Sequence, residues 1–445
     1  MIAIKNLICS IFLGLFCIVC FAGTSKEDKS RVVITTDLGG TDPDDIQSMV
    51  HLLVCSDRID IEGLISSQVW QDFPDKVDSI KAVVDVFCET LPNLACHSDG
   101  YPSAKYLKSI VRQGQTKSNM DGVGLDMDSP GSDFIIDIVD KQSDIRPVWL
   151  VAWGGTNTIA QALWKIKETR NEKEINEFVS KIRIYDILGQ DDAGAWIAKT
   201  FPKLIYIRNK AVYGWQASDE WIKRNIQACG KLGSIYPDRE WVYEGDSPSF
   251  LYLLANGLNV PEHPEYGGWG GRFELGRTKS VRGMDFIEKS GKSEYLHDPY
   301  YMIASASEGS NAISKWKQHI WNDFAARMAW ANTDDYMAAN HHPVVIVDHS
   351  KSLKPIEKVV EAGYCIFDAS KSFDPDGDKL FYNWEIYEYP SSYKGNILIE
   401  NATQSKCRLN IPEEASGSTI HLILSVTDTG FPALTQYKRI VIGVK

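Results

Sequence analysis

The chain has 445 residues, of which 44% are hydrophobic, so it is long enough for two or three domains and too apolar to be disordered throughout. Its formal net charge of -12 and the lack of any basic run disfavour nucleic acid as a partner. Its 13 tryptophans and 19 tyrosines leave a carbohydrate partner open, because exposed aromatic faces hold sugar rings, although most such side chains belong to cores.

Residues 1–22 have the pattern of a secretory signal peptide. Lys5 supplies the positive start, residues 7–21 are apolar, and Ala22 and Gly23 are small residues suited to cleavage. No later apolar stretch is long enough to span a bilayer. The sequence therefore predicts an exported protein, periplasmic, on the cell surface or secreted, with no transmembrane segment.

Four carboxylates lie within nine residues where an apolar strand should end and a helix should begin. The β-branched residues 31–34 lead to Asp37, and apolar residues recur at helical spacing after Asp45. Ligands of open α/β sheets bind at the carboxyl ends of strands, and hard cations such as calcium need several oxygen ligands. We interpret this segment as a cation site.

Helix capping is the alternative explanation for part of this segment. Asp42 would then be the N-cap, Pro43 the first helical residue, and Asp44 and Asp45 an acidic first turn that suits the helix dipole. Capping does not account for Asp37, which lies on the strand side of the turn.

From residue 31 to about residue 340, short β-rich runs alternate with helical patterns. This predicts an α/β domain with a mostly parallel sheet flanked by helices. A strand at 148–152 leads into the glycine-rich segment 154–157, and a strand at 182–188 leads into 189–192. Residues 244–291 are rich in Gly, Pro and aromatic residues and should form long loops, which in compact domains are usually functional.

Residues 344–445 have the period-2 alternation of a small all-β sandwich. Tyr382, Trp384 and Ile386 alternate with more polar neighbours, and the same pattern recurs at residues 420–426. We expect this domain to complete its own core, so that its removal would leave the first domain folded. Within it, the acids at 374, 376 and 378 fit either a calcium loop or ordinary turn chemistry.

Three motifs resemble the nucleoside hydrolase fold. They are Thr35-Thr36-Asp37 with Asp44-Asp45, the loop Trp153-Gly154-Gly155-Thr156-Asn157, and the helix start Trp321-Asn322-Asp323. More closely, segments 244–250 and 266–272 are similar to a family of exported proteins labelled cellulose-binding. The resemblance implies a nucleoside-hydrolase-like domain in residues 31–340 and an immunoglobulin-like β-sandwich in residues 344–445.

The resemblance also implies a calcium site and a mechanism. Asp37, Asp45 and Asp323 would be metal ligands together with the backbone carbonyl of Asn157, and Asp44 would be the general base. A water oriented by calcium would give its proton to that base and attack an anomeric carbon.

The chain departs from nucleoside hydrolases in two ways that put nucleobase recognition in doubt. The spacing from Asp37 to Asp44 is three residues longer, and Asn322 stands where many of those enzymes have a histidine that protonates the leaving base. Protonation of the leaving group would therefore need a different acid. The candidates for contact with a substrate are Asn322, Asp191, Glu244 and Asp246, together with Trp269 as a platform for a sugar ring and Arg272 as a hydrogen-bonding fork. Each of the acids could equally be a structural residue. The glycines around Trp269 could simply permit a turn.

A second His-Asp pair, His297-Asp298, competes with Asp323 for the closing position. We prefer Asp323 because a helical apolar pattern follows it. The sequence thus predicts an exported calcium-dependent glycoside hydrolase acting on a glycan or a furanoside. A non-catalytic protein that binds a cellulose-like polysaccharide is the alternative, and a true nucleosidase is less favoured because of export and the missing histidine.

Overall fold

A computed structural model of the chain describes residues 24–40, 42–68, 76–141, 143–274, 278–279 and 301–445. The predicted signal peptide at residues 1–22 lies outside the described residues. Within the described part, no helix combines the length and the apolar character needed to cross a membrane.

The first domain is built on a sheet with strand order β3-β2-β1-β4-β5-β6-β8-β7. Neighbouring strands pair in parallel except β7 with β8. The strands are β1 (Arg31–Thr36), β2 (Asp60–Ser66), β3 (Val111–Gln113), β4 (Val148–Ala152), β5 (Ile182–Ile187), β6 (Tyr206–Asn209), β7 (Thr278–Lys279) and β8 (Tyr301–Ala304). This confirms the predicted mostly parallel sheet.

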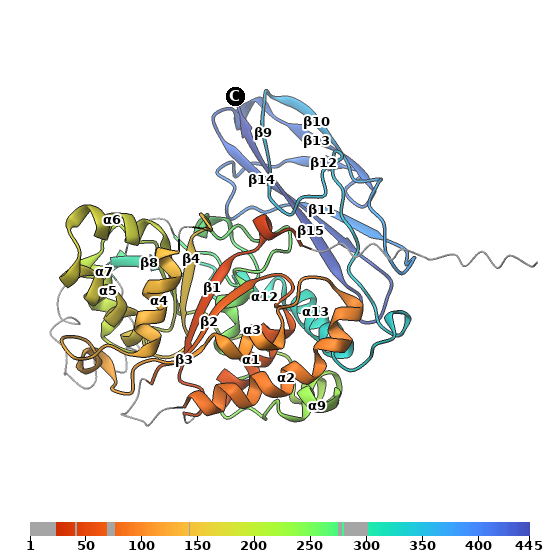
Figure 1. Cartoon of the computed structure of the whole chain (residues 1–445). Helices are drawn as coiled ribbons and strands as arrows, with labels where there is room; N and C mark the ends of the chain where they lie inside the picture. The colour runs from red at the N-terminus through yellow and green to blue at the C-terminus, as the bar shows by residue number, and fades with distance from the viewer. Residues whose placement is uncertain (1–23, 41, 69–75, 142, 275–277, 280–300) are drawn as a thin grey trace, which may run out of the picture.

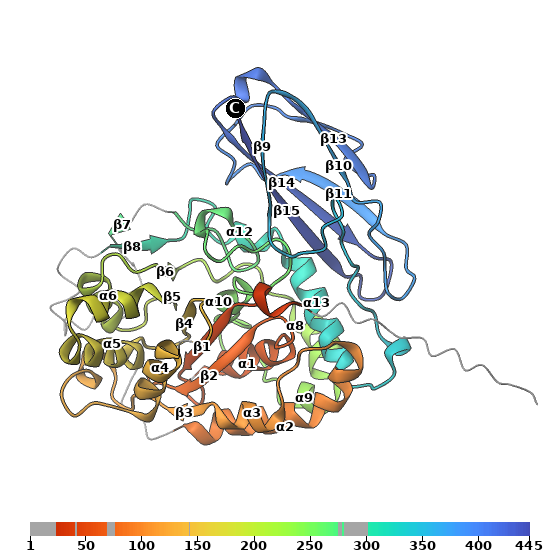
Figure 2. The same ribbon diagram turned by 45° about the horizontal axis from the view of Figure 1, so that its top comes forward.

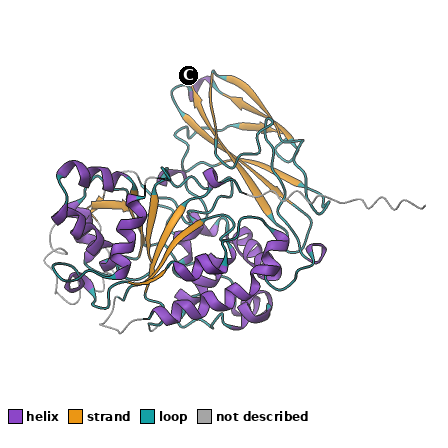
Figure 3. Cartoon of the chain, in the orientation of Figure 1, coloured by secondary structure: helices purple, strands orange, loops and turns teal. Residues whose placement is uncertain are grey.

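Helices cover both faces of this sheet (Figure 1, Figure 3). One face carries α1 (Asp44–Val54), α2 (Val77–His97), α3 (Ala104–Ser109) and α13 (Lys317–Trp330). The other carries α4 (Pro130–Asp140), α5 (Asn157–Thr169), α6 (Glu172–Ser180) and α7 (Ala193–Thr200). The shorter helices are α8 (Asp219–Ile222), α9 (Gly230–Ser234), α10 (Ser247–Leu251) and α12 (Asn311–Ser314).

The central strand β1 shows how the two layers arise from its sequence. All six of its residues are buried; Val32 and Ile34 pack into the core on the α1 side, and Val33 packs into the core on the α5 side. The strand order reverses between β1 and β4, because β2 and β3 lie on one side of β1 and β4, β5 and β6 on the other. Open α/β sheets bind ligands in the crevice at such a reversal, outside the carboxyl ends of the strands.

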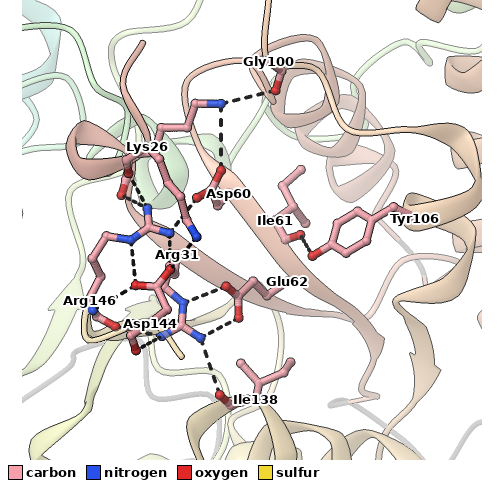
Figure 4. Close-up of polar contacts among 11 residues, drawn as sticks. Lys26, Arg31, Asp60, Ile61, Glu62, Gly100, Tyr106, Ile138, Asp144 and Arg146 are labelled. Atoms are coloured by element: carbon pink, nitrogen blue, oxygen red, sulfur yellow. Dashed lines mark hydrogen bonds and ion pairs between the residues drawn. The ribbon is translucent and has the colours of Figure 1, made fainter. Parts of the chain in front are cut away.

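At the opposite, amino end of the sheet, charged side chains form a paired network (Figure 4). Arg31 makes a two-pronged contact with Glu62, with nitrogen–oxygen distances of 2.7 and 2.8 Å. Arg146 binds Asp60 at 2.9 Å and Asp144 at 2.6 Å. These acids each have a basic partner, so this end of the sheet is electrostatically satisfied.

The C-terminal domain is an all-β sandwich, as predicted. One sheet has the order β10-β13-β12 and the other the order β11-β14-β15-β9. The strands are β9 (Ile356–Val360), β10 (Gly363–Asp368), β11 (Phe381–Ile386), β12 (Leu398–Glu400), β13 (Lys406–Ile411), β14 (Thr419–Thr427) and β15 (Thr435–Val444).

The second sheet of the sandwich faces the first domain (Figure 2), and its central strands β14 and β15 are buried on both faces. Leu422 and Leu424 of β14 face the sandwich core, whereas Ile423 packs into the core of the first domain. Tyr387, Leu434 and Tyr437 join that same core. The sandwich has a core of its own, as expected, and these four residues also extend the core of the first domain. The shared core argues against the expectation that the first domain stays folded without the tail.

Removal of residues 344–445 should therefore destabilise the first domain. Each large apolar side chain taken out of a core costs about 1.5–3 kcal/mol, and a chain that ends at Pro343 loses four of them. We expect this truncated protein to be insoluble or to melt far below the full chain in calorimetry.

A matched pair of substitutions checks the same interface in the full chain. Ile423→Ala should cost about 2–5 kcal/mol, whereas Val359→Ala, at a position on β9 that is 68% exposed, should change stability by less than about 0.5 kcal/mol. Equal melting temperatures for the truncated and full chains would refute the shared core.

Candidate functional site

Aspartates from two distant parts of the chain meet beyond the carboxyl end of β1. Asp37 follows β1, Asp44 and Asp45 open α1, and Asp246 stands immediately before α10. Carboxylate oxygens of Asp44, Asp45 and Asp246 lie within 4.8 Å of one another, and Asp37 shares a hydrogen bond with Asp45. With Asp42, we call this set the acid cluster.

A tight turn carries the chain from β1 into the acid cluster. The N–H of Gly40 donates to the carbonyl of Asp37 at 2.8 Å, and the Thr36 hydroxyl donates to a carboxylate oxygen of Asp45. Helix capping explains little of this arrangement. Pro43 is the N-cap residue, and its side chain makes no capping hydrogen bond. The Asp42 carboxylate accepts the N–H of Asp44 in a long hydrogen bond of 3.3 Å. Capping accounts for Asp42 and leaves the other members unexplained.

The members of the acid cluster raise one another's pKa values. Burial raises the pKa of Asp37 to about 6, and burial followed by repulsion from the neighbouring carboxylates raises those of Asp44, Asp45 and Asp246 well above their usual range. Among the described residues, no Lys, Arg or His forms an ion pair with any member. This contrasts with the paired acids in Figure 4 and leaves concentrated negative charge that a cation would neutralise.

Two glycines let loop backbones approach the acid cluster. A Cβ atom on Gly154, in the loop after β4, would lie 2.5 Å from Oδ1 of Asp37, and one on Gly245 would lie 2.5 Å from Oδ2 of Asp44. Any side chain there would collide with a carboxylate. Gly245 also donates its N–H to Asp44, which lowers the pKa of that carboxyl in opposition to burial.

The structure brings together Asp37, Asp44 and Asp45, three residues proposed from the sequence, and adds Asp246, which was proposed as a substrate contact. The ligand expected from Asn157 is its backbone carbonyl, and that role stays a prediction. Its side-chain amide donates to the carbonyls of Gln68 and Lys117 at 2.9 and 2.8 Å. Among the described residues, the Asn157 side chain thus contacts neighbouring loops. Gly154, three residues before Asn157, lies against Asp37.

Asp191 lies beside Asn157 in a buried polar group at the loop that follows β4. It accepts the hydroxyl of Thr156 at 2.6 Å and the N–H of Asn157 at 3.0 Å, and burial raises its pKa to about 7. Both amide atoms of the nearby Gln68 side chain are buried and have no hydrogen-bond partner in the described part of the chain. Unpaired buried amides are uncommon in folded proteins and call for an explanation.

The proposal that Asp323 closes the metal site is not supported by its surroundings. Asp323 binds Nε of Arg327 at 2.8 Å and lies 2.6 Å from Nε2 of His342, and Arg327 also pairs with Asp57 at 2.6 Å. Burial alone would raise the pKa of Asp323, but Arg327 and His342 outweigh it and hold the pKa well below its usual range. Asp323 is already neutralised, and the aspartate that lies beside Asp44 and Asp45 is Asp246.

Two of the predicted substrate contacts are occupied by structural partners. The Asn322 amide donates to the carbonyl of Ala433 in the C-terminal domain at 2.8 Å. Glu244 is fully buried between Nδ1 of His51 and the Tyr236 hydroxyl, at 2.7 and 2.8 Å. Neither side chain is free to meet a substrate.

The predicted sugar platform is also part of the protein's own packing. Trp269 is 2% exposed and donates to the Tyr437 hydroxyl at 3.3 Å. Arg272 forms a two-pronged ion pair with Glu308. His297 and Asp298, the competing His-Asp pair, lie outside the described residues.

The raised pKa of Asp37 predicts that the stability of the metal-free protein falls as the pH rises. Because the folded-state pKa of Asp37 is about 6 and its ordinary value is 3.8, the folded state binds the proton more tightly. Its contribution to stability is therefore present at low pH and is lost as pH rises from about 4 through 6, on the order of 1 kcal/mol per pKa unit. Thermal melts in chelator should show a smaller loss over this range for Asp37→Asn than for the wild type.

The exposed Asp334 supplies the control for that measurement. Asp334→Asn should keep the wild-type pH dependence. Identical slopes for the wild type and Asp37→Asn would mean that Asp37 does not titrate in the folded protein as described.

Family models match both domains of the chain. Residues 31–273 match the model described as cellulose-binding Sde182, nucleoside hydrolase-like domain, and residues 365–444 match that of cellulose-binding protein Sde0182, C-terminal domain. No curated protein matches the chain.

Among solved structures, the chain is similar to a nucleoside hydrolase-related hypothetical protein from Saccharophagus degradans that is described as associated with carbohydrate metabolism. The two are 43% identical over 94% of this chain and 100% of that one, with a TM-score of 0.89. Small domains also match in part: the PKD domain of KIAA 1837 protein (22% identity, 21% of this chain and 81% of that one, TM-score 0.17) and the titin M3 domain (17%, 23% and 96%, 0.16).

The first family model spans more than half of the chain, and the similar structure covers nearly all of it. The chain therefore belongs to the cellulose-binding Sde182 family, whose members carry a nucleoside hydrolase-like domain.

Proposed function

We propose that this protein is an exported, calcium-dependent glycoside hydrolase that acts on a glycan or a furanoside. The observation that carries the proposal is the acid cluster, whose buried and half-buried carboxylates have no basic partner among the described residues and meet at the ligand-binding end of the sheet. The family description and the carbohydrate association of the similar structure support the class of substrate.

Asp37, Asp45 and Asp246 would hold the ion. Their carboxylates offer the all-oxygen donor set that calcium takes, and the mutual repulsion that raises their pKa values is relieved by a divalent charge. When bound, calcium supplies that charge and makes a coordinated water more acidic.

Asp44 is the proposed general base. The N–H of Gly245 holds its carboxylate in place, and burial is the largest cause that raises its pKa. A base is most effective when its pKa lies near the working pH. Burial therefore favours proton transfer to Asp44 when the ion has relieved the repulsion from the neighbouring carboxylates. Asp44 would take the proton as the water attacks the anomeric carbon.

Asp191 is the remaining candidate for the group that protonates the leaving oxygen, since Glu244 is paired and Asp246 belongs to the acid cluster. With a pKa raised to about 7, about half of its carboxyl groups carry a proton near neutral pH. The unpaired amide of Gln68 in the same polar group is of the kind that a sugar hydroxyl would satisfy.

Substitutions in the acid cluster separate metal binding from catalysis. Asp246→Asn and Asp45→Asn should each lose one calcium per chain in metal analysis. Asp44→Asn should keep that calcium and lower turnover of aryl glycosides or glycans by about 100-fold or more, the usual contribution of a general base.

Asp323→Asn is the matched control, because Asp323 is an equally buried aspartate outside the cluster; it should lower stability and keep the calcium. Unchanged calcium content in Asp45→Asn and Asp246→Asn would refute the metal site. Turnover of inosine or uridine in place of glycans would identify a nucleosidase.

A second candidate function is carbohydrate binding without catalysis, and a groove beside the acid cluster favours it. The groove has a volume of about 510 Å³ and is lined by residues 216–220, by Arg239 and by residues 241–243. Trp241 is 70% exposed there, next to the paired side chains of Asp219 and Arg239. The same loop continues from Tyr243 to Gly245, which touches the acid cluster. A glycan chain could therefore occupy the groove and the acid cluster together.

Trp241→Ala should weaken retention on insoluble cellulose by about tenfold or more, since the contact of a large aromatic side chain contributes about 1.5–3 kcal/mol. Phe431→Ala, at a position in the C-terminal domain that is 89% exposed, is the control and should bind as the wild type does. Weaker retention of Phe431→Ala with unchanged retention of Trp241→Ala would show that the binding surface lies on the C-terminal domain. Strong retention with no product, unaffected by Asp44→Asn, would favour the non-catalytic function.

A further inference from the structure

A second group of aspartates lies in the turn between β10 and β11 of the C-terminal domain. Carboxylate oxygens of Asp374, Asp376 and Asp378 lie within 4.8 Å of one another. One oxygen of Asp374 accepts the N–H groups of Asp376 and Asp378, at 2.9 and 3.1 Å, as in an ordinary turn. The other oxygen, Oδ2, is buried without a hydrogen-bond partner, which turn chemistry leaves unexplained.

Asp428, in the connection between β14 and β15, repeats this pattern. It is 2% exposed, and its Oδ1 accepts hydrogen bonds from the Asn340 side chain and from the N–H groups of Gly430 and Leu434, each at 3.0 Å. Its Oδ2 is buried and has no hydrogen-bond partner among the described residues. A buried carboxylate oxygen without a partner is costly, so this oxygen calls for a hydrogen-bond donor or a cation.

Two sets of contacts bring Asp428 to the turn. Thr429, the residue after Asp428, donates its hydroxyl to Asp378 at 2.9 Å. Asp376 accepts the N–H of His341 at 2.7 Å, and the preceding residue, Asn340, is the one that binds Asp428. Asp376 and Asp428 therefore both bind the segment Asn340-His341, which connects the two domains, and Asp374 and Asp378 lie in the same turn as Asp376.

We propose that these four aspartates form a calcium site at the junction of the two domains. The Asp-x-Asp-Gly-Asp spacing presents carboxylates at alternate positions, as calcium loops do, and Asp428 adds an oxygen from a distant part of the chain. Asn340 offers a further oxygen, because its side-chain Oδ1 is also buried without a partner. The inference does not rest on the proposed function, since no member of the acid cluster takes part.

The charges at the junction are consistent with a cation. Burial, with repulsion from Asp376 and Asp428, raises the pKa of Asp374 to about 6, and burial with repulsion from Asp378 raises that of Asp428. Within the described residues, His341 is the one basic side chain that pairs with the set, at 2.9 Å from Asp376. One histidine does not balance four carboxylates.

Calcium at this position would fix the connection between the domains. His341 stacks on Tyr336 of the first domain with ring centroids 3.7 Å apart, while its N–H and ring bind Asp376 of the second. An ion that holds Asp376 and Asp428 together would hold both ends of the segment 340–341 against the sandwich.

Hydrogen exchange measured by mass spectrometry tests this proposal locally in the full chain. Peptides covering residues 340–345 and 372–380 are compared in chelator and in about 10 mM calcium, roughly ten times the Kd of weak extracellular calcium modules. If local opening releases the ion, exchange should slow about tenfold in both peptides. No slowing in the wild type would overturn the proposal.

Variants separate the junction from the acid cluster. Asp428→Asn and Asp374→Asn should each abolish the calcium-dependent slowing at the junction, and Asp246→Asn and the exposed Asp334→Asn should keep it. Metal analysis should show one calcium fewer per chain in Asp428→Asn. Loss of the slowing in Asp246→Asn, with retention in Asp428→Asn, would assign the effect to the acid cluster and refute the junction site.

Discussion

Repulsion among buried carboxylates is the constraint around which the first domain is arranged. The turn after β1 and the start of α1 place three of them together by local geometry, and the loop before α10 adds Asp246 from 200 residues away. The hydrogen bonds from Thr36 and Gly245 orient these groups without neutralising them. Such an arrangement lowers the stability of the metal-free fold and is expected at sites shaped for a ligand rather than for stability.

Some acids outside the acid cluster are paired with a basic side chain. The buried Asp323 is held by Arg327, and the half-buried Glu62 is held by Arg31 with two contacts. A basic partner distinguishes Asp323 from Asp45, whereas burial does not, because both side chains are almost completely buried.

The elements that depend on local sequence could be predicted. The strand before Asp37, the helix after Asp45 and the all-β character of the tail follow from short-range patterns of apolar residues. The predicted calcium ligands at these positions lie together because they are near one another in the chain.

The remaining site residues depend on contacts that no local pattern contains. Asp246 lies directly before α10, whereas Asp323 lies in the middle of α13 and not at the helix start expected from the sequence. No local pattern indicates how far either residue lies from Asp45. One local signal was available: Arg327 follows Asp323 by four residues, the spacing of an ion pair on a helix. Likewise, Asp246 precedes a short helix with proline in its first turn, much as Asp42 precedes Pro43. Trp269 could not be assigned to the core from the sequence, since its partner Tyr437 belongs to the last strand.

The two buried faces of β14 restrict how this protein can change over evolution. A strand of an isolated sandwich can vary freely on its solvent side, but in β14 that side is occupied by Ile423 and the wall of the first domain. A sandwich taken from another protein would present polar residues there and leave the first domain's core uncovered. The C-terminal sandwich is therefore inherited together with the domain it covers, and it does not behave as an exchangeable module.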